Sequence, residues 1–176
     1  MDWFGPAVAV RRSALDEMVR SAAASSDGTE TGGFLFGAED AKYGSQNVVI
    51  VCHAGDAGPG ASRRRDFFRP DVVHAQHLAL DAFTADGSQW IGTWHTHLRW
   101  RSGRPSSSDL TTYRSHLREP ALGFSRFVCI ILTPTLRIWP AGLCWEQLHC
   151  HAWVVGERSL FSADVVVVTD EESICS

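Results

Sequence analysis

The sequence predicts an α+β fold, a single domain with a mixed, mostly antiparallel sheet flanked by helices. The length of 176 residues is typical of one domain with its own core. Short runs of β-branched residues recur along the chain, and helix-like segments separate only some of them. Because no repeat or low-complexity stretch divides the chain, we expect one domain over residues 1–169, followed by a frayed acidic tail over residues 170–176.

In the N-terminal part, the predicted strands are short apolar runs without helical spacing. Valine and isoleucine are frequent in these runs, and glycine ends one of them. A helix is expected from Ser13 to Ala24, capped by the Ser13 hydroxyl and with acidic residues in its first turn. The strands cover residues 7–12, 33–37, 47–53 and 64–68.

Two more helices are expected in the middle of the chain. Pro70 suits the first turn of a helix that reaches about Phe83. A serine of the Pro-Ser-Ser-Ser run begins another helix, which ends near Leu117. The later strands are 89–95, 127–133, 136–140, 144–155 and 163–169, and a Thr-Pro-Thr turn is expected after the second of these.

Composition argues against several classes of partner. The net charge of −4 gives no general attraction for nucleic acid or an anionic membrane, and no apolar run is long enough to span a bilayer. The N-terminus has no signal-peptide pattern. The five cysteines lack paired spacing, and Cys52 and Cys129 lie inside apolar runs, as expected of buried reduced thiols. We therefore expect a cytoplasmic protein without nucleic-acid or membrane partners.

The most informative stretch ends an apolar strand and continues into the start of a helix. His95 and His97 are two residues apart, so both imidazoles point to one face of the strand. Asp109 lies in the first turn of the following helix, which brings its carboxylate back toward the strand end. Two imidazoles and a carboxylate can hold a catalytic zinc ion and leave the fourth position to water. We predict one Zn²⁺ ion at these three residues.

Each part of this pattern also has a simpler interpretation. A His-x-His pair is common, and Ser106 with Asp109 has the spacing of a helix capping box. For Glu30 the simpler interpretation is a solvated loop residue, as most glutamates are, but its place just before the apolar Gly-Phe-Leu-Phe strand argues against it. The combination of these parts in a strand–loop–helix context nevertheless favours a metal site.

Taken together, the motifs resemble the JAMM signature of the JAB/MPN metalloproteases. The second part of that signature corresponds to His95-Thr-His97 and Pro105-Ser106-x-x-Asp109. The upstream part, Glu-x-x-Gly-x-Leu-x-Gly, is matched at every fixed position by Glu30, Gly33, Leu35 and Gly37. The resemblance covers most of the chain and is strongest to compact prokaryotic JAB isopeptidases of the deubiquitinase type. It implies that residues 1–169 form an MPN/JAB-type domain.

The resemblance also implies roles and partners. Zinc lowers the pKa of a bound water toward neutrality. Glu30 would be the general base and then the general acid, and Ser106 would donate a hydrogen bond to the oxyanion. The implied substrates are conjugates or precursors of ubiquitin or a ubiquitin-like protein. The implied partners include E1/E2-like enzymes encoded in the same operon, some of them in antiphage defence systems.

Two other functional classes remain as alternatives. One is a non-catalytic MPN scaffold for protein assembly, although such scaffolds typically lose a ligand or the glutamate, and all five residues are present here. The other is a JAB-like protein associated with DNA repair, for which the net charge offers no basic surface.

The loop after the second histidine departs from the family pattern. Leu98 replaces the usual proline, and the spacer from His97 to the serine is one residue longer than usual. We interpret this as a one-residue insertion that spares the metal ligands. Three residues near this loop, Trp100, Arg101 and Arg104, are predicted to bind an acidic or extended substrate segment.

Other histidine and cysteine clusters are interpreted as structural. Cys150 should face away from its two histidine neighbours on a strand, so these three residues cannot share an ion without a bend. Those neighbours are His149 and His151. On a predicted helix, His74 and His77 form a pair without a third ligand, and His53 ends a strand.

Overall fold

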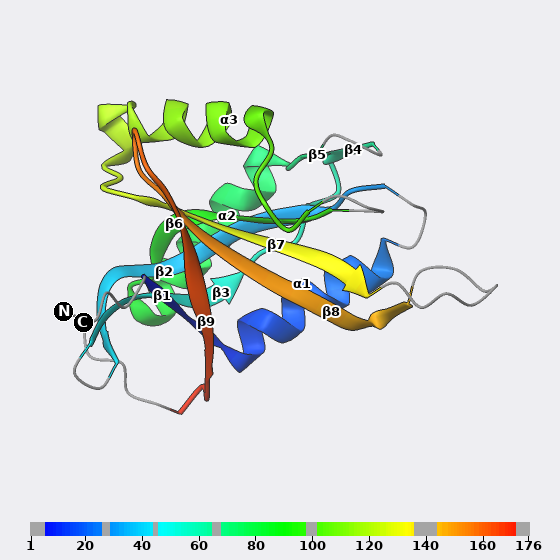
Figure 1. Cartoon of the computed structure of the whole chain (residues 1–176), viewed down its shortest axis with the longest axis horizontal. Coiled ribbons are helices and arrows are strands. Elements are labelled where there is room, and N and C mark those ends of the chain that lie inside the picture. Colours follow the sequence, from blue (N-terminus) through cyan, green and yellow to red (C-terminus); the bar gives the residue numbers. More distant parts are fainter. Residues whose placement is uncertain are drawn as a thin grey trace.

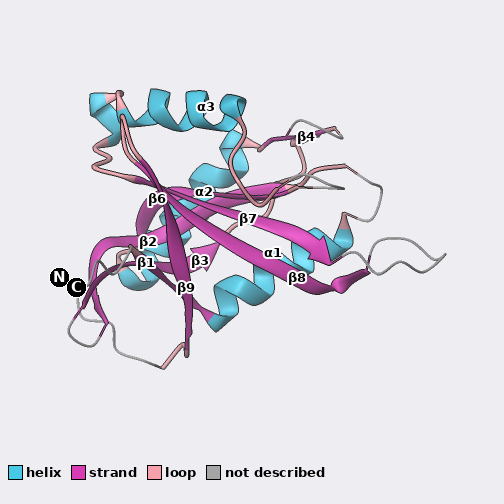
Figure 2. Cartoon of the chain, in the orientation of Figure 1, coloured by secondary structure: helices cyan, strands magenta, loops and turns pink. Residues whose placement is uncertain are grey.

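A computed structural model describes residues 6–25, 29–43, 46–64, 68–97, 102–135 and 144–171. Within these ranges, seven strands form a closed barrel in the order β1-β3-β2-β6-β7-β8-β9 (Figures 1 and 2). They are β1 (Ala7–Arg11), β2 (Gly32–Tyr43), β3 (Gln46–Ala54), β6 (Gln89–Thr96), β7 (Phe127–Thr135), β8 (Cys144–Val155) and β9 (Leu160–Val168). The helices are α1 (Arg12–Ala24), α2 (Val72–Asp86) and α3 (Ser107–Leu117); a small hairpin pairs β4 (Ser62–Arg63) with β5 (Phe68–Arg69).

The predicted α+β fold with a mixed sheet is confirmed. Strand β2 pairs antiparallel with β3 and β6, and β8 pairs antiparallel with β7 and β9. The parallel pairs are β6 with β7 and β1 with both β3 and β9. Strand β1 therefore closes the sheet on itself, which the order of elements along the chain did not predict.

Helices α1 and α3 lie on opposite sides of the sheet (Figure 1). On α1, Ala14, Met18 and Ala22 recur every four residues and form one buried stripe in the main core. On α3, the Tyr113 ring stacks on Phe127 of β7, with ring centroids 4.8 Å apart. The contact between Tyr113 and Phe127 packs α3 against β7, next to β6, the strand that carries His95.

The predicted N-cap of the first helix is wrong. Helix α1 begins at Arg12, one residue earlier, and Arg11 occupies the N-cap without a side-chain hydrogen bond. The Ser13 hydroxyl instead donates to Asp170 Oδ1 over 2.6 Å, and its backbone N–H lies 3.3 Å from the same oxygen. Because this acceptor comes from the other end of the chain, local sequence could not reveal it. The acidic residues also fall outside the first turn of α1.

Three other element predictions need correction. Helix α2 begins after Pro70, because the Asp71 carboxylate accepts hydrogen bonds from two backbone N–H groups of the first turn. Of the strand expected over 64–68, Arg64 is not part of a strand and Phe68 begins β5, while 65–67 lie outside the described residues. The expected Thr-Pro-Thr turn instead continues β7, and Pro134 pairs with Leu148 of β8. The strand expected over 136–140 lies outside the described residues.

Two glycines of the Glu30 motif lie where strands approach each other closely. A Cβ at Gly33 would come within 1.9 Å of the Gly55 carbonyl oxygen, and one at Gly37 within 1.9 Å of the Ile50 carbonyl oxygen. Only glycine fits such backbone approaches. These two glycines of the motif thus allow β2 to pack closely against β3 and the residues after it, which helps to fix the position of Glu30 just before β2.

Cys52 and Cys129 are buried free thiols, as expected. Burial raises the pKa of both groups, so neither is prepared for reaction as a thiolate. None of the described helices combines the length and apolar character needed to cross a membrane.

Candidate metal centre

The register between β2 and β6 brings the two halves of the motif together. Gly32 pairs with His95, and the Thr96 backbone N–H donates to the Thr31 carbonyl over 2.8 Å. The same antiparallel register, continued by two residues, brings Glu30 near His97, and the charge of Glu30 acts on this imidazole. Glu30 is 4% exposed, so the simpler interpretation of a solvated loop glutamate does not hold.

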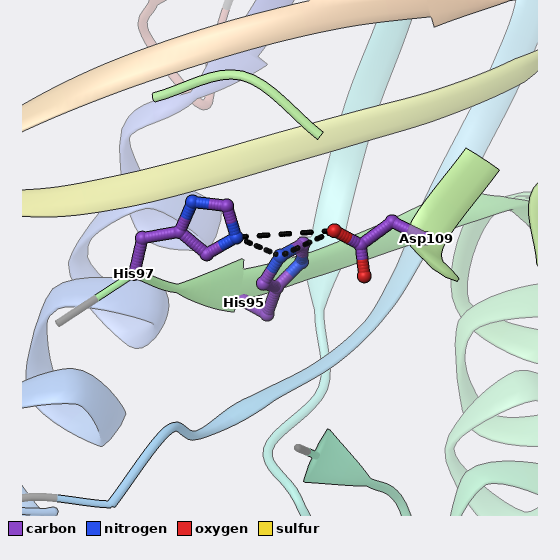
Figure 3. A group of neighbouring side chains, drawn as sticks. All are labelled: His95, His97 and Asp109. Carbon is purple, nitrogen blue, oxygen red and sulfur yellow. Dashed lines mark hydrogen bonds and ion pairs between the residues drawn. The ribbon is translucent and has the colours of Figure 1, made fainter. Parts of the chain in front are cut away.

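Three side chains converge at the end of β6 (Figure 3). The Nε2 atoms of His95 and His97 lie 3.0 Å apart, and Asp109 Oδ2 lies 3.7 Å from the first and 3.9 Å from the second. Ligands of a tetrahedral zinc ion lie about 3.3 Å from one another, given metal–ligand distances of about 2.0–2.1 Å. The donor set and its spacing therefore fit one zinc ion.

The start of α3 holds the Asp109 carboxylate in place. Asp109 Oδ2 accepts a hydrogen bond from the Ser106 backbone N–H over 2.7 Å, and Ser106 Oγ accepts one from the Asp109 backbone N–H over 3.2 Å. This reciprocal capping box is the simpler interpretation of the Ser-x-x-Asp spacing, and the helix uses it. The same oxygen of Asp109 faces both histidines, so the capping box also orients a candidate ligand.

The charges around the cluster favour metal binding. Burial acts to raise the pKa of Asp109, but the nearby imidazole of His97, the charge of His95 and hydrogen bonds with Ser106 hold it well below its usual range. Burial acts to lower the pKa of His97, but the nearby carboxylate of Asp109, the hydrogen bond to the Ser102 carbonyl and the charge of Glu30 raise it. The carboxylates of Asp109 and Glu30 therefore give the site a negative charge, which attracts a cation.

Each imidazole also has a partner on its other nitrogen. His97 Nδ1 lies 2.8 Å from the Ser102 carbonyl oxygen. His95 Nδ1 lies 3.5 Å from the Tyr113 hydroxyl, to which the Cys129 thiol donates over 3.3 Å. Such outer contacts orient the rings of metal-binding histidines. Sequence reasoning missed Ser102 and Tyr113, because only the fold brings them to the rings.

The three candidate ligands line a cavity of about 720 Å³ that extends between α2 and α3. Glu30 and Ser106 line the same cavity. Away from the metal cluster, its wall is an apolar recess formed by Phe34, Val72, Ala79, Trp90 and Leu122. Sequence patterns did not reveal this recess, since its residues come from four separate elements: β2, α2, β6 and a short 3-10 helix, Pro120–Leu122.

The predicted substrate-binding residues are placed differently. Trp100 and Arg101 lie outside the described residues. Arg104 is exposed, and its guanidinium lies 5.7 Å from the centre of the Trp153 ring rather than in the wall of the cavity. A role of these three residues in substrate binding stays a prediction.

Within the described ranges, His95, His97 and Asp109 form the one group of three potential metal ligands. His74 Nε2 pairs with Asp56 Oδ1 over 2.6 Å, and His53 Nε2 pairs with an oxygen of Asp86 over 3.0 Å. These pairings agree with the structural interpretation of both histidines.

Comparisons with known proteins identify the family of this chain. A family model described as prokaryotic homologs of the JAB domain matches residues 11–156. A protein of Sinorhizobium fredii described as a probable metalloprotease is 29% identical over 147 residues, which cover 82% of this chain and 81% of that protein. The solution structure of protein DSY2949 from Desulfitobacterium hafniense superimposes with a TM-score of 0.59 at 16% identity, covering 92% of this chain and 93% of that one. The chain belongs to the prokaryotic JAB family.

Proposed function

We propose that this protein is a zinc-dependent peptidase that hydrolyses the bond after the C-terminus of ubiquitin or a ubiquitin-like protein. Family membership and the similarity to a probable metalloprotease support a metal-dependent peptidase. The observation that carries the proposal is the convergence of His95, His97 and Asp109 in a cavity that Glu30 also lines. Bound zinc would supply a water activated at neutral pH and would polarise the substrate carbonyl.

We assign the movement of protons to Glu30. Its carboxylate is buried, lines the cavity and lies beside His97. A carboxylate in that position can take a proton from the attacking water and deliver it to the departing amine.

We assign the stabilisation of the substrate oxyanion to Ser106. Its Oγ accepts the backbone N–H of Asp109, which leaves the hydroxyl a hydrogen to donate. The side chain lines the cavity beside Asp109. A donor at this place stabilises the negative charge that develops on the carbonyl oxygen.

The exposed apolar residues on the outer face of α2 support a folded protein as the substrate. Val73, Leu80 and Phe83 are 62%, 64% and 59% exposed, and Val72, at 56%, also lines the cavity. The apolar face is thus continuous with the cleft. We propose that it holds the apolar surface of a ubiquitin-like protein whose extended tail enters the cavity.

Basic residues in the sequence between His97 and Ser106 suggest which part of this protein would contact an acidic segment of a substrate or partner. We propose that Arg101 and Arg104, with Trp100, contact such a segment of the substrate or of an E1/E2-like partner. Replacing Arg101 by glutamate should raise KM for a protein substrate and leave a short peptide unaffected; Arg104 is kept in this variant because it also contacts Trp153. Equal effects on both substrates would contradict this assignment.

The central experiment compares the wild type with Glu30→Gln on ubiquitin-like proteins that carry C-terminal extensions or isopeptide-linked lysines. Cleavage is followed by mass spectrometry and bound zinc by elemental analysis. We expect the wild type to bind one zinc and cleave at the modifier's C-terminus, and Glu30→Gln to keep the zinc and lose cleavage. Retained cleavage in the variant would exclude Glu30 as the base, and zinc without cleavage in the wild type would favour the scaffold alternative.

A further inference from the structure

We propose that Trp153 and His151 of β8 form a seat for residues 102–104 and thereby position His97 for metal binding. The described residues that line the cavity include neither side chain, so both are positioning residues. The proposal rests on metal binding at the site, but it concerns how the chain orients one ligand and not which bond is cleaved.

The argument begins at the second nitrogen of His97. Its Nδ1 lies 2.8 Å from the Ser102 carbonyl oxygen. A carbonyl oxygen can only accept, so Nδ1 carries a hydrogen, and in the neutral ring Nε2 keeps the lone pair. Nε2 is the atom that faces His95 and Asp109. The Ser102 carbonyl thus selects the tautomer of His97 that can bind a metal.

Trp153 holds the residues next to that carbonyl. Its indole Nε1–H donates to the Gly103 carbonyl oxygen over 2.7 Å. The guanidinium of Arg104 lies over the face of the same indole, 5.7 Å from its centre. One side chain of β8 therefore contacts two consecutive residues of the segment that presents the Ser102 carbonyl.

His151, two residues before Trp153 on β8, forms the other part of the seat. Its Nε2 lies 3.1 Å from Thr133 Oγ1 of β7, which restrains the ring. A Cβ at Gly103 would lie 2.0 Å from Cδ2 and 2.2 Å from Cγ of this ring. Gly103 is not one of the glycines with a left-handed backbone in the described chain. The imidazole alone therefore requires glycine at this position.

The seat also explains how a longer loop can keep a metal ligand in place. The spacer from His97 to Ser106 has one residue more than the family pattern. Contacts from β8 hold residues 102–104 at the point where the chain returns to the site.

A steric double-mutant cycle tests the seat directly. Gly103→Ala should weaken zinc binding by about 10–100-fold, the usual cost of losing an outer partner of a metal ligand. His151→Ala makes room for the added methyl group, so the double variant should bind zinc more tightly than Gly103→Ala alone. Zinc affinity is measured by competition with a chromogenic chelator. A double variant that binds no more tightly than Gly103→Ala would overturn the proposal.

Trp153→Phe keeps a ring on β8 and removes only the indole donor. We expect weaker zinc binding and, in the metal-free protein, ¹⁵N shifts of His97 that move from the Nδ1-protonated form toward a mixture of tautomers. Trp90→Phe is the matched control, since it also loses an indole bond to a backbone carbonyl, that of Gly92, and should keep its zinc affinity.

Unchanged zinc affinity and unchanged His97 shifts in Trp153→Phe would also overturn the seat. A wild type that binds no zinc would contradict the proposed function instead. The tautomer of His97 in the metal-free protein would then still test the seat, so the two failures are distinguishable.

Discussion

Ser106 combines a structural contact with a candidate catalytic contact in one hydroxyl group. As the N-cap of α3 it accepts the backbone N–H of Asp109, and at the same time it lines the cavity beside the metal cluster. The first contact stabilises the helix and orients a ligand, and the second could stabilise a transition state. Substitutions that differ in capping ability can separate these effects.

Ser106→Ala and Ser106→Gly should both lower peptidase kcat by about 100–1000-fold, because both lack the oxyanion donor. Their effects on stability should differ. Alanine at an N-cap costs about 1 kcal/mol, whereas glycine costs only a few tenths. Rates and chemical denaturation of both variants check this. If Ser106→Gly kept normal activity, the Ser106 hydroxyl would act only as the N-cap of α3 and not in catalysis.

At the scale of elements, α2 is fixed at its C-terminal end by a small ionic network. Asp86 accepts hydrogen bonds from Arg11 at the end of β1 and from His53 on β3, each over 3.0 Å, and from the Ser88 backbone N–H. Three elements that are distant in sequence meet at this carboxylate. The opposite, outer face of α2 is the apolar surface proposed for substrate docking.

Asp86 should make stability depend on pH in the acid range. Burial acts to raise the pKa of Asp86, but hydrogen bonds from Ser88 and the charge and hydrogen bond of His53 lower it overall. A lowered pKa contributes stability above the unfolded value of about 3.9 and loses it as the pH falls through the folded value. Asp86→Asn should therefore lose about 1–2 kcal/mol at pH 7.

Urea unfolding of the wild type and Asp86→Asn from pH 7 to pH 3 measures this contribution. The difference between the two should begin to shrink below about pH 4, where the Asp86 carboxylate of the unfolded chain starts to gain a proton while that of the folded protein stays ionised to lower pH. Asp81→Asn, an exposed position on the same helix, is the control and should show no such change. A difference that stayed constant over this range would contradict the ionic explanation.

Charge on the outer face of α2 should impair protein substrates selectively. Leu80→Glu and Phe83→Glu place a carboxylate on the proposed docking surface, so we expect a raised KM for a ubiquitin-like fusion and normal kinetics on a short peptide. Thr111→Glu, at an exposed position of α3 that does not line the cavity, serves as the control. Normal KM for the fusion in both α2 variants would remove this helix from the proposed interface.

At the scale of the whole molecule, barrel closure joins the two ends of the chain. Strand β1 lies between β3 and β9, and Asp170, just beyond β9, accepts the hydrogen bonds of Ser13 at the start of α1. Helix α1 fills the core that this closure creates. The metal cluster depends on the same sheet through β6, so we expect the site and the barrel to unfold together.

Met18→Ala tests this coupling. Met18 is 0% exposed and packs in the main core cluster. Its truncation should lower the free energy of unfolding by about 2–5 kcal/mol. Bound metal should be released in the same denaturant transition that reports loss of secondary structure. Release of metal in an earlier, separate transition would show that the site unfolds independently.

The sequence predicted much of the candidate site because local spacing determines it. The alternation of side chains along a strand placed His95 and His97 together, and the capping box placed Asp109 in the first turn of α3. The order of the main strands and helices followed from local patterns as well. Errors fell at the start of α1 and in β7, where Asp170 and the pairing with β8 override local preference.

By itself, then, the sequence determined the ligand set, the glutamate motif and the α+β order of elements, since each depends on residues close together in the chain. Only the tertiary structure decided the remaining features: barrel closure by β1, the register that sets Glu30 beside His97, the apolar recess, and the seat of Trp153 and His151. Each of these is a contact between residues far apart in sequence. Such contacts form through packing and strand pairing across the whole domain, which no local pattern encodes.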